Sequence, residues 1–173
     1  MIRLCLAVLA AAVLSIHALP ATARVVESRQ FGNWLYEYNV SRTVTSCVAS
    51  RYYSNAQFSV RLYGNRMDVV FFRSDFRFRW DARQGTSVIR VRGNTYRLAS
   101  STPRRGNATA PRASVLYLTV PGGRYRTFYD DLKRARNLQI TLWNNAKYTV
   151  DLTGSSRALS AALSCWERNR TGS

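Results

Sequence analysis

Apolar and polar residues alternate along most of the chain with a period of two. In one C-terminal run, Tyr148, Val150 and Leu152 are each separated by a single polar residue. This period sends alternate side chains to opposite faces of a strand, so it predicts half-buried β-strands. The strands expected on this basis span residues 34–40, 46–53, 58–63, 67–72, 75–80, 86–92, 95–99, 115–120, 138–142 and 148–152.

Turn residues separate these runs, and two stretches change to a helical period. Gly64-Asn65 and Gly93-Asn94 predict two tight hairpins. After Arg157 the apolar residues recur at spacings of three and four, which predicts a C-terminal helix, and residues 127–136 predict a shorter one. The expected fold is therefore mainly β, an antiparallel β-sandwich or flattened barrel of about nine or ten short strands with a C-terminal helix.

The first 23 residues have the pattern of a cleaved secretory signal peptide. Arg3 precedes an apolar run at residues 4–14, and Ala21-Thr22-Ala23 supplies small residues for cleavage after Ala23. The alternative is a retained N-terminal anchor, but the run is shorter than the ~20 apolar residues that a spanning helix needs. We therefore expect a bacterial periplasmic or secreted protein without a transmembrane helix. Its polar lead-in would span residues 24–30, its single β-rich domain 31–168 and its polar tail 169–173.

Removal of this segment leaves two cysteines, Cys47 and Cys165. An even number of cysteines in an exported chain predicts a disulfide between them. The alternative is a pair of buried free thiols. The bridge would close most of the domain into one covalent loop.

The chain is strongly basic, with a formal net charge of +17. Only Lys133 and Lys147 are lysines, so nearly all of the positive charge is carried by arginine. A guanidinium group binds phosphate or carboxylate in two-point geometry, which lysine cannot match. The expected partners are anionic envelope components (lipopolysaccharide, phospholipid head groups or acidic glycan) or an acidic protein.

The residue inventory excludes several classes of catalysis. The only histidine, His17, lies in the expected signal peptide. Without it the mature chain has neither a Ser-His-Asp nor a Cys-His site, nor a histidine metal site. No Gly-x-Ser-x-Gly motif is present, and no cofactor is expected. A pair of carboxylates for glycoside hydrolysis stays open as an alternative.

The basic residues of the expected strand at 75–80 and its neighbours form the candidate binding surface. Alternation places Phe76, Phe78 and Trp80 on the face opposite Arg77 and Arg79. Because a base-stacking platform needs arginines and aromatics on one exposed face, specific nucleic-acid binding is not expected. The hypothesised anion-binding residues are Arg73, Arg77, Arg79, Arg90, Arg92, Arg97, Arg104 and Arg105.

Both ends of the domain resemble one family. Phe31-Gly32-Asn33-Trp34 is similar to the Phe-Gly-Asp-Trp opening of exported alphaproteobacterial proteins related to the invasion-associated locus B protein. The run at residues 151–159, with Gly154 before an Ala/Leu helix, resembles the closing segment of those proteins. Family members place a cysteine shortly after the opening tryptophan, whereas Tyr38 stands in that region here. The resemblance implies an envelope-associated β-sandwich linked to host interaction, and it brings no catalytic residues.

Taken together, these features lead us to expect a non-enzymatic exported binding protein. Two alternatives stay open: a carboxylate-dependent hydrolase acting on envelope glycan, and a purely structural envelope component. The hydrolase needs two acids about 5–10 Å apart in a cleft. A structural component would show no specific ligand.

Overall fold

The structure of the chain is a computed structural model that describes residues 24–106 and 112–170. Within those ranges it is mainly β, with ten strands in one antiparallel sheet and a C-terminal helix, which confirms the expected fold class. The elements are β1 (Arg24–Phe31), β2 (Trp34–Val40), β3 (Thr45–Tyr52), β4 (Ala56–Tyr63), β5 (Arg66–Arg73), β6 (Arg83–Val91), β7 (Asn94–Ser101), β8 (Val115–Val120), the 3₁₀ turn η1 (Gly122–Arg124), α1 (Tyr125–Arg134), β9 (Asn137–Thr141), β10 (Lys147–Asp151) and α2 (Ser155–Arg170).

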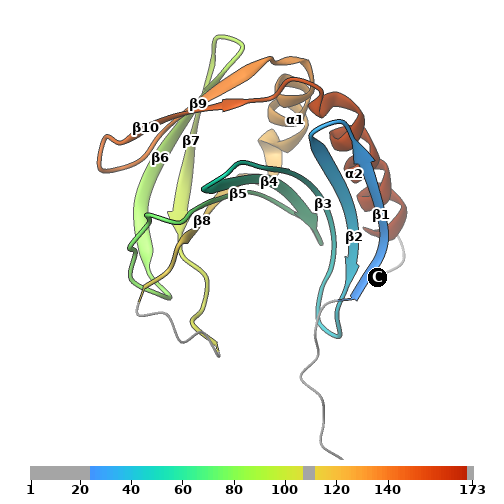
Figure 1. The fold of residues 1–173 in the computed structure, drawn as a ribbon, viewed down its shortest axis with the longest axis horizontal. Coiled ribbons are helices and arrows are strands. Elements are labelled where there is room, and N and C mark those ends of the chain that lie inside the picture. The colour runs from blue at the N-terminus through green and yellow to red at the C-terminus, as the bar shows by residue number, and fades with distance from the viewer. Residues whose placement is uncertain (1–23, 107–111, 171–173) are drawn as a thin grey trace, which may run out of the picture.

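The sheet has the strand order β1-β2-β3-β4-β5-β8-β7-β6-β9-β10. In Figure 1 the strands from β6 and β7 through β8, β5 and β4 to β3 and β2 form an arch, with β9 and β10 crossing above it. Helices α1 and α2 lie on the outer side of this arch (Figure 1), and α2 packs across β1 to β4. The other face of the central strands lines the inside of the arch.

Alternation explains which face holds the core. Phe58, Phe71 and Leu116 are register neighbours on β4, β5 and β8, and all three side chains are buried on the face that the helices cover. The far end of the sheet folds back over this face, as shown by the ring of Tyr148 on β10, which lies 5.2 Å from the ring of Phe71. Burial of such side chains is the main driving force for this arrangement.

One of the two predicted hairpin turns is shifted by one residue. Gly64-Asn65 joins β4 to β5 as expected, whereas the β6–β7 turn is Arg92-Gly93. Both turn residues have positive φ, 50° for Arg92 and 81° for Gly93, as a two-residue turn between twisted strands requires. Asn94 is therefore the first residue of β7.

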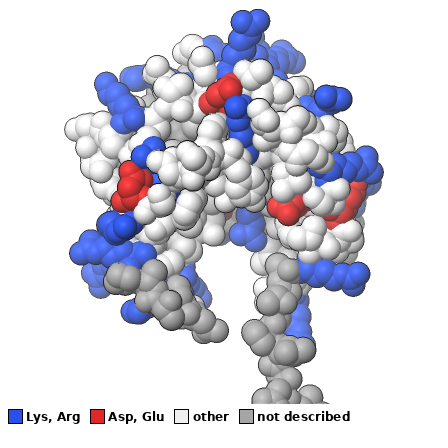
Figure 2. Space-filling view, in the orientation of Figure 1, with Lys and Arg blue, Asp and Glu red and all other residues white. Residues whose placement is uncertain are grey.

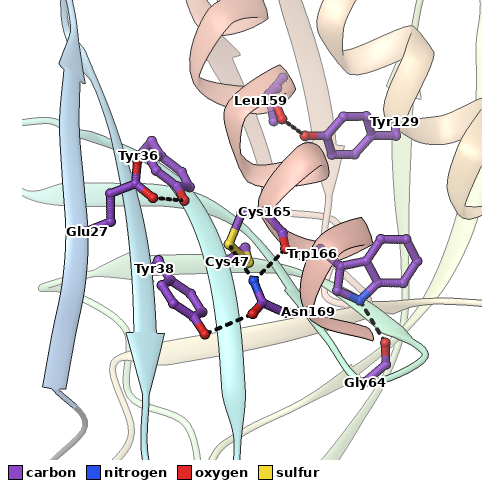
Figure 3. The surroundings of a disulfide bond; sticks show 10 residues. All are labelled: Glu27, Tyr36, Tyr38, Cys47, Gly64, Tyr129, Leu159, Cys165, Trp166 and Asn169. Atoms are coloured by element: carbon purple, nitrogen blue, oxygen red, sulfur yellow. Dashed lines mark hydrogen bonds between the residues drawn. A yellow bond between two sulfur atoms is a disulfide. The ribbon is translucent and has the colours of Figure 1, made fainter. Parts of the chain in front are cut away.

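Helix α2 is covalently attached to the sheet. Cys165 forms a disulfide with Cys47 on β3, as predicted from the cysteine count. Figure 3 shows the surrounding hydrogen bonds, in which Tyr38 donates to Asn169 at 3.0 Å and the Trp166 indole donates to the Gly64 carbonyl at 2.7 Å. The Tyr129 hydroxyl of α1 donates to the carbonyl of Leu159, so α1 is tied to the same helix.

Three boundary predictions are wrong. Residues 24–30 are not a lead-in but most of β1, an exposed edge strand whose backbone pairs with β2. The short helix begins at Tyr125 and ends at Arg134, earlier than the 127–136 expected. Helix α2 runs to Arg170, two residues into the predicted tail. The expected signal peptide and the end of the tail lie outside the described residues.

The strand predicted at residues 75–80 is also wrong. Phe76 donates its amide to the Arg73 carbonyl in a turn, and the only ladder pairing in this stretch is an isolated bridge between Phe78 and Ala113. Phe76 is nevertheless buried, with its ring 5.6 Å from that of Phe71. Core packing of the aromatic residues thus accounts for the alternation without a strand. No helix in the described part of the chain is both long and apolar enough to cross a membrane.

Candidate anion-binding cleft

A cleft of about 670 Å³ opens inside the arch, within the ~300–1,000 Å³ typical of ligand sites. Its roof is the inner face of β4, β5 and β8, the face turned away from the helices. One wall comes from residues 81–83 and 101–104, and Val44 of the β2–β3 turn completes the lining. Figure 2 shows the molecule hollowed at this place, with basic side chains in the hollow and beside it. A smaller hollow of about 490 Å³ lies beside the C-terminal end of α2 and has one arginine, Arg42, in its lining.

The strand register brings polar side chains together on the roof. Asp68 on β5 is paired with Arg61 on β4 and with Thr119 on β8. Directly opposed side chains on one face of a sheet lie roughly 5 Å apart at Cβ. The core residues Met67 and Val69 flank Asp68 in sequence and point to the other face. The same alternation that builds the core therefore builds a polar row across the roof.

Asp68 is buried, with only 4% of its surface exposed. Its Oδ2 accepts a hydrogen bond of 2.6 Å from the hydroxyl of Tyr63. Its Oδ1 has no hydrogen-bond partner among the described residues. Burial, helped by the hydrogen bond to Asp68, raises the pKa of Tyr63, so the tyrosine stays a neutral donor. The carboxylate is thereby held in place within the roof, and its Oδ1 has almost no surface open to the cleft.

Four arginines line the cleft: Arg61, Arg66, Arg83 and Arg104. The guanidinium of Arg61 lies 4.9 Å from the centroid of the Tyr63 ring, a cation–π contact that orients it along the roof. All four ion pairs found among the described residues involve other arginines. Among the described residues, none of the four cleft guanidinium groups forms a direct ion pair. The lining is therefore net basic even with Asp68 and Asp81 in it.

Hydrogen bonds hold the wall that carries Arg83 and Arg104. The buried hydroxyl of Thr102 donates to the Arg79 carbonyl at 2.7 Å and accepts from the Ala82 amide at 3.0 Å. The Asp81 amide donates to the Pro103 carbonyl at 3.0 Å. These bonds join two segments twenty residues apart, so both arginines stand on a braced wall.

The structure does not bring the eight sequence-predicted arginines together. Arg73 forms an ion pair with Asp75 at 2.8 Å and lies over the Tyr148 ring. The Arg73 hydrogen bonds lower the pKa of the Asp75 carboxyl. Arg77 donates to the carbonyls of Ser74 and Phe76, so its guanidinium braces the turn.

The other predicted arginines lie on the β6–β7 hairpin, in the loop segments before β6 and after β7, and on the cleft wall. Arg90 and Arg97 are exposed on one face of the hairpin, and Arg92 is in its turn. Arg79 and Arg105 are exposed. Arg104 is the one predicted anion-binding residue that lines the cleft.

Arg61, Arg66 and Arg83 were missed by sequence reasoning. One signal was available, because Asp68 interrupts the apolar run Met67–Phe72 and marks a polar face on a central strand. The register that places Arg61 beside it was not visible in the sequence.

No family model, no curated protein and no solved structure matches this chain. The candidate function therefore rests on the geometry and chemistry of the cleft.

Proposed function

We propose that the protein is a non-enzymatic exported binding protein that takes an anionic ligand in the arch cleft. The observation that carries the proposal is the convergence of four arginines from separate segments on one hollow of about 670 Å³. Guanidinium groups bind carboxylate and phosphate by paired hydrogen bonds. A concave basic site also concentrates field and speeds the capture of anions.

The intramolecular disulfide supports an exported location, because such bonds persist in oxidising compartments. Within that location we propose the bacterial periplasm or the medium, after cleavage of the signal peptide behind Ala23. The resemblance to the invasion-associated locus B proteins supports an envelope role that includes contact with a host. The proposed ligands are envelope lipopolysaccharide, phospholipid head groups or acidic glycan, or an acidic protein.

The test compares two double variants with the same change in charge. Arg61→Gln/Arg66→Gln removes two cleft arginines, and Arg90→Gln/Arg97→Gln removes two exposed arginines from the β6–β7 hairpin. Binding to lipopolysaccharide, to phosphatidylglycerol vesicles and to polygalacturonate is measured at a fixed 150 mM salt, by biolayer interferometry on the disulfide-bonded protein.

We expect the cleft variant to lose at least tenfold in affinity for one of these probes and the hairpin variant to lose less than threefold. Equal losses in both variants would show that binding follows net charge alone. A loss confined to the hairpin variant would move the site to the surface predicted from the sequence.

A carboxylate-dependent hydrolase is a second candidate, since Asp68 and Asp81 line the same cleft. One acid is buried and the other exposed, as a proton donor and a base can be. Release of reducing ends from polygalacturonate or peptidoglycan, abolished by Asp81→Asn, would support this activity. A protein with no ligand in any of these assays would instead fit the structural envelope component.

A further inference from the structure

We propose that two copies of this chain associate edge to edge, with β1 of one copy pairing antiparallel with β1 of the other. This surface takes no part in lining the cleft, so the inference goes beyond the proposed function and does not depend on it. The observation that carries it is self-complementarity, because one pairing register places Glu27 of each copy opposite Arg29 of the other.

Strand β1 is an open edge of the sheet (Figure 1). Among the described residues it pairs only with β2, and helix α2 packs mainly against β2 and β3 rather than against this strand. Six of its eight residues are exposed, and they include Val25 and Val26, two of the three large exposed hydrophobic residues of the described chain. A long exposed edge with apolar side chains is a template for another strand.

The opposite edge of the sheet, at β10, is better protected. This strand has five residues, and the carbonyl of its last residue, Asp151, accepts hydrogen bonds from the Arg51 guanidinium at 3.0 Å and the Tyr53 hydroxyl at 3.1 Å. Short strands and covered edges are means of preventing edge-to-edge pairing. The edge available to a second copy is therefore β1.

The turn after β1 determines which backbone groups face the open edge. Phe31 pairs with Trp34 across a two-residue turn, and residues that flank such a turn exchange both N–H···O bonds. Bonded and non-bonded positions then alternate along an antiparallel ladder. The backbone groups of Phe31 and Arg29 therefore bond to β2, whereas those of Gln30 and Ser28 point to the open edge.

The charged residues of β1 select one alignment with a second copy. Pairing Ser28 with Ser28 of the second copy places Glu27 opposite Arg29 at two symmetry-related positions. A shift by two residues in either direction places Glu27 opposite Glu27, or Arg29 opposite Arg29. Opposite charges directly across a ladder stabilise the pairing, and like charges destabilise it. The favoured alignment is two-fold symmetric, so it closes a dimer.

In this alignment the four charged side chains form a square of alternating sign. Within one β1 the Nε of Arg29 lies 2.9 Å from Oε1 of Glu27, and the Arg29 side chain is 67% exposed. The hydroxyl of Tyr36 donates to the other carboxylate oxygen of Glu27 at 3.2 Å, which holds the acid in place. Because Arg29 uses Nε for its own pair, its terminal N–H groups can donate to Glu27 of the second copy.

The exposed valines lie at the ends of this pairing. The same alignment brings Val25 and Val26 of one copy beside the Phe31 end of the other, where apolar surface is removed from water. A β-bulge between Val25 and Glu27 bends the strand there and limits the length of regular pairing. The paired core is therefore residues 27–29, and we expect a reversible dimer.

The experiment follows the mass of the disulfide-bonded protein by sedimentation equilibrium at concentrations up to about 500 μM. About 0.3 M salt brings the Debye length below about 8 Å, which screens the general repulsion between two basic chains. We expect the wild type to pass from monomer to dimer and no further, because the pairing uses the β1 edge of both copies.

Two substitutions at the centre of the pairing test the site. Ser28→Pro removes the outward N–H, and an edge strand tolerates proline where its N–H faces solvent. Ser28→Thr is the matched control, because it keeps the N–H. We expect Ser28→Pro to raise the dimer dissociation constant at least tenfold and Ser28→Thr to change it less than threefold.

Two charge variants test the alignment. Glu27→Arg makes both charges of β1 positive and Arg29→Glu makes both negative, so each variant alone would oppose like charges twice. We expect each to dimerise at least tenfold more weakly than the wild type. An equimolar mixture opposes unlike charges at both positions, so it should form a mixed dimer within threefold of the wild-type dissociation constant. This recovery in the mixture shows that both variants are folded.

Two results would overturn the inference. One is a wild-type protein that stays monomeric over the whole concentration range. The other is a dimer that Ser28→Pro leaves unchanged or that the mixed charge variants fail to restore, which would place the contact or the alignment elsewhere. Anion binding by the Arg61→Gln/Arg66→Gln variant tests the proposed function separately, because neither residue belongs to β1.

Discussion

The disulfide between Cys47 and Cys165 supplies a large part of the stability of the fold. Its partners are 118 residues apart, so on the loop-entropy relation the bridge contributes about 5 kcal/mol by restricting the unfolded chain. Domains of this size unfold with roughly 5–15 kcal/mol in total. Removing the bridge therefore takes away a third or more of the stability.

Other contacts also hold α2 on the sheet, so we expect the folded state to keep its shape without the bond. Ala158, Leu159 and Ala162 of α2 are fully buried, and the indole of Trp166 donates to the Gly64 carbonyl. The loss should therefore arise in the unfolded state, which gains freedom. We expect the Cys47→Ala/Cys165→Ala variant to lose about 4–5 kcal/mol of unfolding free energy.

Urea unfolding of the oxidised protein, the reduced wild type and the double alanine variant measures this difference. Far-ultraviolet circular dichroism and tryptophan fluorescence report the two transitions, and coincident curves license the two-state treatment. Reduction is the matched control, because it breaks the bond without changing a side chain. A loss below about 1 kcal/mol in both reduced and substituted proteins would refute the loop-closure reasoning.

Two further predictions concern a pair of tyrosines and one glycine. Burial first, together with acidic neighbours, raises the pKa of Tyr36 and of Tyr96 to about 12, against about 10 in the unfolded chain. The stability that these two neutral hydroxyl groups add to the folded state is complete below pH ~10 and is lost as the pH rises towards 12. The Tyr36→Phe/Tyr96→Phe variant should therefore show a smaller fall of the urea midpoint at alkaline pH. An unchanged slope would contradict this assignment. Gly85→Ala should cost at least about 1 kcal/mol in urea unfolding, because φ is +122° and the new Cβ would lie 3.1 Å from Trp143. Gly122→Ala, with nothing within 4 Å, is the control and should be nearly neutral.

The failed strand at residues 75–80 shows the limit of periodicity. The alternation at Phe76 and Phe78 reports that these side chains pack against the core. In a central strand such packing is accompanied by backbone pairing, but packing alone does not require it. Here the backbone turns after Arg73 and pairs with Ala113 at a single position. In β1 the prediction failed in the opposite way, because a strand is present where no alternation was seen. Its side chains are mostly polar and exposed, since an edge strand needs hydrogen bonds from only one neighbour and no buried face.

The features that depend on the local order of residues, or on how many residues of a type are present, could be predicted before the structure was known. Period-two runs predicted most of the strands, and a helical period predicted α2. The two cysteines that follow the expected signal peptide predicted the bridge. The strands and the helix follow from the face on which each side chain lies, and the bridge follows from the number of cysteines.

The cleft, by contrast, depends on contacts between segments that lie far apart in the sequence. Alternation tells which face Arg61 and Asp68 occupy, but the strand that lies beside each of them is chosen by long-range pairing. Strand β8 is paired with β5 although more than forty residues separate them, and Thr102 ties the wall of Arg83 and Arg104 together. The physical reason is that strand order and loop bracing depend on the packing of the whole chain, whereas a residue's face depends only on its neighbours in sequence.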